Sequence, residues 1–438
     1  MAAIPVAIVL LTVSLSAQEP GKCDPSPELR AAAARQPGPA SQLEIGLWFA
    51  GKGNLPCAVA AFRSAIRLKP DSAEALGNLG ALYDRQGRSL EAEQFLRRAV
   101  QADPNYVAGY LSLGIVLAGQ ARFAEAEQAL RKGLALQPGH PALLTALGMS
   151  LMRQRQVDAA IPVFEQAAAI QPGSAQSHMN LGIALADATR RVEALARFET
   201  AVRLEPNSAP GHYNRGRVLL ELKRYEEAKA ALERAHQLDP SRGPTRRLLG
   251  MAYAYSGDPA RAIPHLRASL QLEPENVAAH LELGKALLKE GRQDGLDHLK
   301  KAVELDSRDS AAVFALMRAM LARDSPEAAE YGKQFRELKE EELATTRARV
   351  LSNFALGSAK DNDWALAISR LREAVQVCGQ CRARADLLKN LGLVLLQSGD
   401  PAQARNELRS ALDLNPQDRD VEYALSLAVR SSAGGVRK

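Results

Sequence analysis

The chain has 438 residues. Because a single compact core rarely grows beyond about 250–300 residues, it folds either as several domains or as a linear stack of repeats. Hydrophobic residues at 46% and charged residues at 24% exclude a chain that is disordered throughout, and only 5% aromatic residues favour closely packed helices built on Leu, Ala and Val. A net charge of +6 over this length requires no nucleic-acid partner.

The N-terminal segment predicts export. Residues 2–17 are apolar or small and too few to span a bilayer comfortably as a helix. We therefore predict a signal peptide over residues 1–17, a periplasmic or secreted protein, and no stable membrane span after processing. No Lys or Arg precedes the apolar stretch, so an uncleaved anchor and a wrongly assigned start remain alternatives. Residues 18–38 are expected to be a proline-rich leader with at most a short turn over 28–35, because prolines at this density prevent regular helix.

A 34-residue period begins at residue 39. Proline and glycine each recur at this interval, and an alanine lies twelve residues after most of these glycines. The prolines are Pro70, Pro104, Pro138, Pro172, Pro206, Pro240 and Pro274, and the glycines are Gly46, Gly80, Gly114, Gly148, Gly182, Gly216, Gly250 and Gly284. The small residues at positions 8 and 20 of each unit allow two helices to approach closely, and the proline at position 32 stops the second helix. Glycine is frequent at position 15, where positive φ is expected between the helices.

These residues resemble the tetratricopeptide repeat, a helix–turn–helix unit. The resemblance covers roughly residues 39–430 and implies an all-α fold, a right-handed superhelical α-solenoid whose first helices line a concave face. Residues 39–309 hold eight units, the last of them one residue short, and 310–347 form a degenerate unit with an extended second helix. Two further units over 348–418, a capping helix over 419–430 and a frayed tail over 431–438 complete the expected organisation.

Asparagine recurs at position 6 of the first helix, where side chains are expected to reach the groove. The positions are Asn78, Asn180, Asn214, Asn353 and Asn390. An amide has two donors and an acceptor, so it can pair with the backbone of an extended peptide whatever its sequence. The pattern resembles the asparagine ladder of the repeat domain in O-linked N-acetylglucosamine transferases. The alternative is that these amides only form hydrogen bonds with a neighbouring repeat.

Basic residues gather at neighbouring groove positions. Arg217 and Lys285 are at position 9, and Arg247 and Tyr213 are at position 5. Since the guanidinium fork suits carboxylates, this set predicts capture of an acidic segment or a C-terminal carboxylate. The alternative for each single residue is ordinary solvated charge.

Four cysteines allow two local pairs. Cys378 and Cys381 lie between the tenth and eleventh units, where a structural disulfide or two inert thiols are favoured over redox catalysis. Cys23 and Cys57 are expected to pair if the compartment is oxidising.

No catalytic or metal-binding motif is present. The sequence has no HExxH, GxxxxGK[ST] or GxSxG segment, so we expect no catalytic residue, cofactor or metal. The histidines near unit starts are interpreted as surface or inter-repeat residues; they are His140, His178, His212 and His280.

The sequence therefore favours a non-catalytic protein–protein interaction scaffold or adaptor that binds a peptide or protein segment in the concave groove. One alternative is an accessory subunit that presents substrates to a separate transferase or a secretion or assembly machine. RNA binding by a related helical repeat is disfavoured by the strict spacing and the predicted export. The oligomeric state remains open.

Overall fold

A computed structural model describes residues 23–434, so the predicted signal peptide over residues 1–17 lies outside the described residues. The described part of the chain contains 23 helices and no strand, which confirms the all-α prediction. Within it, no helix combines the length and the hydropathy needed to cross a membrane.

The chain divides into two compact units at residue 240, and each is described by itself. The first unit contains α1 (Pro27–Arg35), α2 (Pro39–Gly51), α3 (Leu55–Leu68), α4 (Ala73–Arg85), α5 (Ser89–Ala102), α6 (Val107–Gly119), α7 (Phe123–Leu136), α8 (Pro141–Arg153), α9 (Val157–Ile170), α10 (Ala175–Asp187), α11 (Arg191–Leu204), α12 (Ala209–Glu221) and α13 (Tyr225–Leu238).

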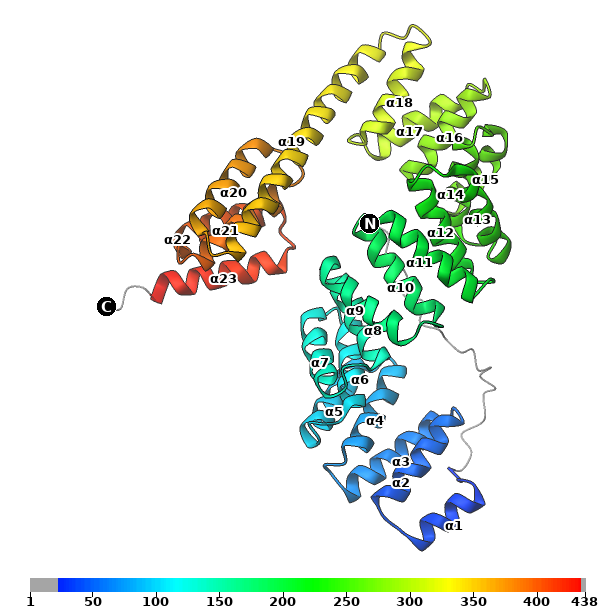
Figure 1. Cartoon of the computed structure of the whole chain (residues 1–438), viewed down its shortest axis with the longest axis vertical. Helices are drawn as coiled ribbons and strands as arrows, with labels where there is room; N and C mark the ends of the chain where they lie inside the picture. The colour runs from blue at the N-terminus through cyan, green and yellow to red at the C-terminus, as the bar shows by residue number, and fades with distance from the viewer. Residues whose placement is uncertain (1–22, 435–438) are drawn as a thin grey trace. The chain divides into compact units, whose positions relative to one another are not determined.

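The second unit contains α14 (Gly243–Tyr255), α15 (Pro259–Leu272), α16 (Val277–Lys289), α17 (Gly295–Leu305), α18 (Ser310–Leu321), α19 (Ala328–Lys360), α20 (Trp364–Cys378), α21 (Arg384–Gln397), α22 (Pro401–Leu414) and α23 (Arg419–Gly434). In both units, consecutive helices pack against each other as a linear stack of helix pairs, as Figure 1 shows. The prediction of an α-solenoid of helix–turn–helix units is confirmed.

The glycine at position 8 lets the two helices of a pair approach each other closely. A Cβ atom added at Gly80 on α4 would lie 2.7 Å from Leu96 Cγ and 3.1 Å from the Ala92 carbonyl oxygen, both on α5. Real Cβ atoms essentially never approach a heavy atom as closely as 2.7 Å, and 3.1 Å is tighter than most Cβ contacts. A side chain here would therefore displace Leu96 and press the two helices apart.

The turn between the paired helices has a left-handed residue at position 15 in every unit. Glycine occupies it at Gly53, Gly87, Gly257, Gly291 and Gly399, and other residues occupy it at Ala121, Arg155, Thr189, Lys223, Asp324 and Asn362. Positive φ reverses the chain direction after the first helix, so the second helix runs back along it.

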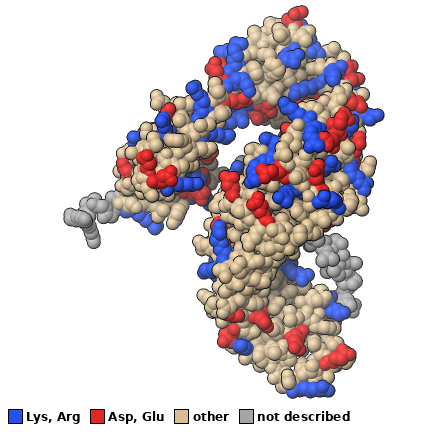
Figure 2. Space-filling model, in the orientation of Figure 1, with Lys and Arg blue, Asp and Glu red and all other residues tan. Residues whose placement is uncertain are grey.

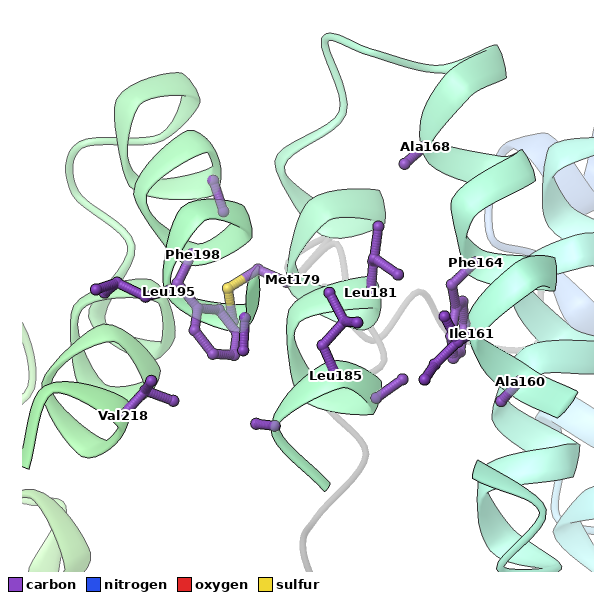
Figure 3. Close-up of a cluster of buried hydrophobic side chains, with 14 of the residues drawn as sticks. Ala160, Ile161, Phe164, Ala168, Met179, Leu181, Leu185, Leu195, Phe198 and Val218 are labelled. Carbon is purple, nitrogen blue, oxygen red and sulfur yellow. The ribbon is translucent and has the colours of Figure 1, made fainter. Parts of the chain in front are cut away.

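The core consists of successive clusters of buried apolar side chains between neighbouring helix pairs. In the first unit, Leu181 and Leu185 of α10 lie beside Ile161 of α9, and Met179 on the same helix meets Phe198 of α11 (Figure 3). Because every helix contributes to the contacts on both sides, each pair is stabilised by its neighbours.

Two disulfides use all four cysteines of the chain. Cys23 bonds to Cys57 at the start of α3, and Cys378 bonds to Cys381 just after α20. The first bridge ties the leader to the first helix pair. The leader also contains α1, longer than the short turn expected there, because Pro27 occupies the first helical position, where proline is tolerated, and Ser26 caps the helix.

The ninth and tenth units share one helix. Residues 328–360 form the single 33-residue α19, so the expected boundary between 347 and 348 falls inside a helix. The segment 333–356 contains neither proline nor glycine, and nothing in it stops the helix. Figure 1 shows α18 beside the first part of α19 and α20 beside the last part. At the C-terminus, α23 continues to Gly434, so the expected tail over 431–438 begins as helix.

Candidate functional site

The five candidate asparagines all lie on the first helix of a pair, but they differ in their hydrogen bonds. Asn78 Nδ2 donates to the Glu74 carbonyl oxygen at 2.8 Å, and Asn214 Nδ2 donates to the Pro210 carbonyl oxygen at 3.0 Å. Asn180 Oδ1 accepts a bond of 2.7 Å from Gln176 Nε2. These three half-buried amides are each held by their own helix, which uses only part of their hydrogen-bonding capacity.

The last two asparagines come together in a cavity between α19 and α21. This cavity of about 230 Å³ is lined by Arg349, Ser352, Asn353, Ala383, Asp386, Leu387 and Asn390. We call it the C-terminal groove pocket. Asn390 Nδ2 donates to Ser352 Oγ at 3.2 Å, whereas the side-chain amide of Asn353 makes no hydrogen bond within the described residues. The structure therefore brings Asn353 and Asn390 to one site, with one of the two amides unpaired.

The charges of this pocket are opposite and unpaired. Arg349 and Asp386 are exposed, and neither makes an ion pair with any described residue. With the two asparagines they offer a cation, an anion and neutral donors and acceptors within one hollow. Such a set matches a polypeptide, whose backbone carries both N–H and C=O groups.

A buried disulfide packs with two residues that line the pocket. Cys378 and Cys381 are each 4% exposed, and they pack in a core cluster with Ala348, Ala383 and Leu387. Gly379 in the loop has a φ of 56°, which turns the chain sharply after α20. The bridge thus helps to fix the loop that carries Ala383 and the start of α21.

Two of the three predicted basic residues, Arg217 and Lys285, lie beside a carboxylate of their own helix. In the first unit, the half-buried Arg217 Nη1 lies 4.0 Å from Glu221 Oε1. Burial raises the pKa of Asp187 in the preceding repeat, and the charge of Arg217 partly opposes this effect. Tyr213 lies one turn earlier on the same helix and is half-buried. Arg217 therefore has carboxylates on both sides.

Arg247 and Lys285 belong to the second unit. Lys285 Nζ lies 2.9 Å from Glu282 Oε1, a carboxylate that also accepts a bond of 3.1 Å from the Tyr255 hydroxyl. Glu282 is buried, so Lys285 supplies the charge that its carboxylate needs. Arg247 points Nη1 toward Met251 Sδ at 3.7 Å, and its buried Nε atom has no hydrogen-bond partner.

Charged side chains of both signs are mixed over the visible face of the molecule, without a large area of one sign (Figure 2). The other prominent hollow, of about 470 Å³, lies over a single turn at residues 273–276, so it brings together no side chains from separate elements. The C-terminal groove pocket is consequently the better candidate site in the part of the chain that the structure describes.

Three histidines have a structural role that the sequence analysis did not specify. At position 4 of their units, His178, His212 and His280 are buried, and each ring Nε2 bonds to the carbonyl oxygen of the proline six residues earlier. The distances are 3.1, 2.9 and 2.9 Å respectively. The recurrence of histidine six residues after the position-32 proline is a sequence signal for this bond.

No group of three or more His, Cys, Asp or Glu residues within the described range is arranged to hold a metal ion. The fold defines a class of helical-repeat proteins, in which stacked helix pairs present extended surfaces for binding.

Comparison with known families specifies this class. Sequence models described as tetratricopeptide repeat match residues 43–107, 111–175 and 247–310, and another model of the same description matches residues 209–242 and 385–418. These ranges cover more than half of the chain, and the protein belongs to the tetratricopeptide repeat family. Members of this family are generally non-catalytic scaffolds for protein–protein interaction.

Several solved structures are similar to part of the chain. YrrB, described as a tetratricopeptide repeat protein with an unusual peptide-binding site, is 23% identical over 43% of this chain and 96% of its own, with a TM-score of 0.39. PilF of Pseudomonas aeruginosa is 20% identical over 50% and 98%, with a TM-score of 0.44. A repeat protein from Parabacteroides merdae is 16% identical over 56% and 97%, with a TM-score of 0.43. A comparison with curated protein sequences gave no match.

Proposed function

We propose that this protein is an exported, non-catalytic scaffold that holds a polypeptide segment in its C-terminal groove pocket. The observation that carries the proposal is the convergence of Arg349, Asn353 and Asn390 from two successive first helices. Arg349 and Asn353 have no partner within the described chain, so a bound segment can satisfy both without breaking an existing bond.

The chemistry of the pocket favours recognition of main-chain groups and a carboxylate. The asparagine amides accept N–H groups and donate to C=O groups of an extended segment. Arg349 suits a carboxylate on that segment, either an acidic side chain or the C-terminus. The unpaired Asp386 then faces N–H donors rather than a second acid, which limits how many acidic residues the pocket accepts.

The disulfides support the proposed location outside the cytosol. Disulfides persist in oxidising compartments and are rare in cytosolic proteins, and here all four cysteines are paired. The mass of the protein purified from its native host tests this point, since export with cleavage predicts a chain that lacks residues 1–17. An intact N-terminus on a cytosolic protein would contradict it.

Binding to a peptide array tests the pocket. Random 12-residue peptides with free carboxyl ends are probed with the wild type and with the double variant Asn353→Ala/Asn390→Ala. Loss of most bound peptides in the double variant is expected. The matched control is Asn105→Ala, an exposed asparagine in a turn of the first unit. An unchanged peptide profile in the double variant, with its helical circular dichroism intact, would refute the proposed site.

The same pocket would serve an accessory subunit that presents a bound segment to a separate enzyme. Co-purification of a transferase or an assembly component that still binds the double variant would assign this role, because such a partner must contact a surface other than the pocket.

A further inference from the structure

The first helix of the tenth unit exposes a face that is buried in its neighbours. Positions 3 and 7 of the eighth, ninth and eleventh units are buried, namely Ala279, Leu283, Ala312, Leu316, Leu387 and Leu391. The same positions in the tenth unit are Val350 and Phe354, which are 64% and 56% exposed. The difference is confined to the unit whose first helix is part of α19.

The shared helix explains this exposure. In the ninth unit, Leu316 packs in one core cluster with Leu299 and Ala302 of the preceding helix, α17. In the tenth unit the preceding helix is the first part of α19 itself, which continues along the same axis. A straight helix cannot fold over its own side chains, so the surface that normally receives a preceding helix stays uncovered.

The exposed surface is a stripe along one side of α19. Leu343 is 60% exposed, and at about 100° per residue it falls within about 40° of Val350 and Phe354 around the helix axis. We call these three residues the α19 face. The guanidinium of Arg370 on α20 lies 5.9 Å from the centre of the Phe354 ring and borders the face on one side. Apolar residues at this spacing receive a helix that lies alongside.

The flanks of the α19 face are basic. Arg336 and Arg347 lie in the same angular sector of the helix, and both are exposed without an ion pair to any described residue. Lys339 is neutralised by Glu342. Glu340 is the one unpaired acid on these flanks, so the arginines leave a net positive rim around the apolar stripe.

We infer that the α19 face docks an amphipathic helix of a partner protein, with an apolar stripe that covers Leu343, Val350 and Phe354 and acidic flanks that meet Arg336 and Arg347. The uncovered repeat positions specify the helical shape of the occupant, and the unpaired arginines specify its charge. None of the three residues of the α19 face lines the C-terminal groove pocket, so the inference goes beyond the proposed groove binding.

Two synthetic 21-residue helical peptides test the inference by fluorescence anisotropy with the full chain. They share one leucine stripe at positions i, i+3, i+4 and i+7, and their flanks carry either Glu or Lys. The Glu peptide should bind at least about tenfold more tightly than the Lys peptide, since each well-placed ion pair and each buried side chain changes affinity by a measurable factor.

Three variants localise the binding. Val350→Ser/Phe354→Ser should weaken the Glu peptide at least about tenfold, because two large apolar side chains no longer become buried. Arg336→Gln/Arg347→Gln should bring the two peptides to within about threefold of each other. The control Leu90→Ser/Val192→Ser removes side chains that are 74% and 71% exposed on other helices and should change nothing.

The inference is overturned if the Glu peptide does not bind, if it binds the serine variant as tightly as the wild type, or if the two peptides bind equally. Sedimentation velocity without peptide tests whether a second copy of the chain covers the α19 face instead of a partner helix. A dimer that disappears in Val350→Ser/Phe354→Ser would show that a second copy, and not a partner helix, covers the face. None of these variants removes a groove asparagine, so groove binding is tested independently.

Discussion

The eighth unit offers a direct test of how closely the paired helices approach. A Cβ atom at Gly284 on α16 would lie 2.8 Å from the backbone carbonyl oxygen of Gly295, the first residue of α17. In the reverse direction, a Cβ at Gly295 would lie 2.6 Å from the Gly284 oxygen. Leu299 Cδ2 would also lie 2.7 Å from the Cβ at Gly284, and a rotamer change of Leu299 can relieve that contact. It cannot relieve the contact with the Gly295 oxygen, because that atom belongs to the backbone. Gly284→Ala must separate the helices.

The expected loss follows from these distances. Ordinary contact begins near 3.4 Å, so the methyl group stands about 0.6 Å too close. Overpacking costs about 1–3 kcal/mol, and a contact with a backbone oxygen that cannot move aside belongs to the upper part of that range, about 2–3 kcal/mol. The better helix propensity of alanine returns about 1 kcal/mol. We therefore expect a net destabilisation of about 1–2 kcal/mol. Since about 1.4 kcal/mol corresponds to tenfold, amide exchange in α16 and α17 should accelerate roughly 5–30-fold.

Hydrogen-exchange mass spectrometry on the full chain measures this effect locally. The matched control is Gly357→Ala, which introduces the same methyl group on α19 at a site with no heavy atom within 4 Å. That variant should exchange more slowly by a factor that corresponds to roughly 0.5–1 kcal/mol. If Gly284→Ala also slows amide exchange in α16 and α17, or leaves it unchanged, the close approach of the two backbones is refuted.

Three further results are expected. Asp418 accepts backbone N–H bonds at the start of α23 and lies 3.1 Å from Lys389 Nζ; Asp418→Ala should cost about 1–2 kcal/mol and speed tryptic cleavage within α23. Burial, reinforced by a neighbouring histidine, lowers the pKa of His298 below 6.5, so its neutral form is favoured in the folded state. The stability that depends on neutral His298 is complete above about pH 6.5 and declines as the pH falls toward the folded pKa. Amide hydrogens of α17 should therefore exchange faster at pH 5.5 than at pH 7.5, after correction for intrinsic exchange rates. His298→Gln should remove this difference. Reduction of the Cys23–Cys57 bridge should expose residues 23–38 to protease while the repeats stay folded, and an equally resistant leader would contradict this role.

The helix pairs were predictable because their determinants are local and repeat in the sequence. The glycine at position 8, the alanine at position 20 and the proline at position 32 each act within one unit, so the period alone places the helices. The fused helix was harder to predict. Its signal is the lack of proline and glycine over residues 333–356, whereas the degenerate sequence there was interpreted as an extended helix within one unit.

The candidate site was predictable only in part. Position 6 placed every asparagine on a first helix, but the pattern treats all five alike. Asn78 differs from Asn353 because its amide already donates a hydrogen bond to the carbonyl oxygen of Glu74. The partners of Arg217 and Lys285 lie four residues later and three residues earlier in the sequence, on the same helix face. That spacing gives a sequence signal for intrahelical pairing, which the interpretation as a single basic groove did not use.

The turns between paired helices leave room for stabilisation by simple substitution. Six of them hold a non-glycine residue at φ between 52° and 62°. Asp324 and Asn362 tolerate this conformation, whereas it costs each of the other four roughly 1 kcal/mol or more. Thr189 is the most strained type among them, because its branched Cβ crowds the left-handed backbone. Since each repeat contacts only its neighbours, glycine substitutions in distant turns should contribute additively. The natural sequence thus lies well below the stability that its own fold permits, and the turns provide a graded series of sites for raising it without altering either binding surface.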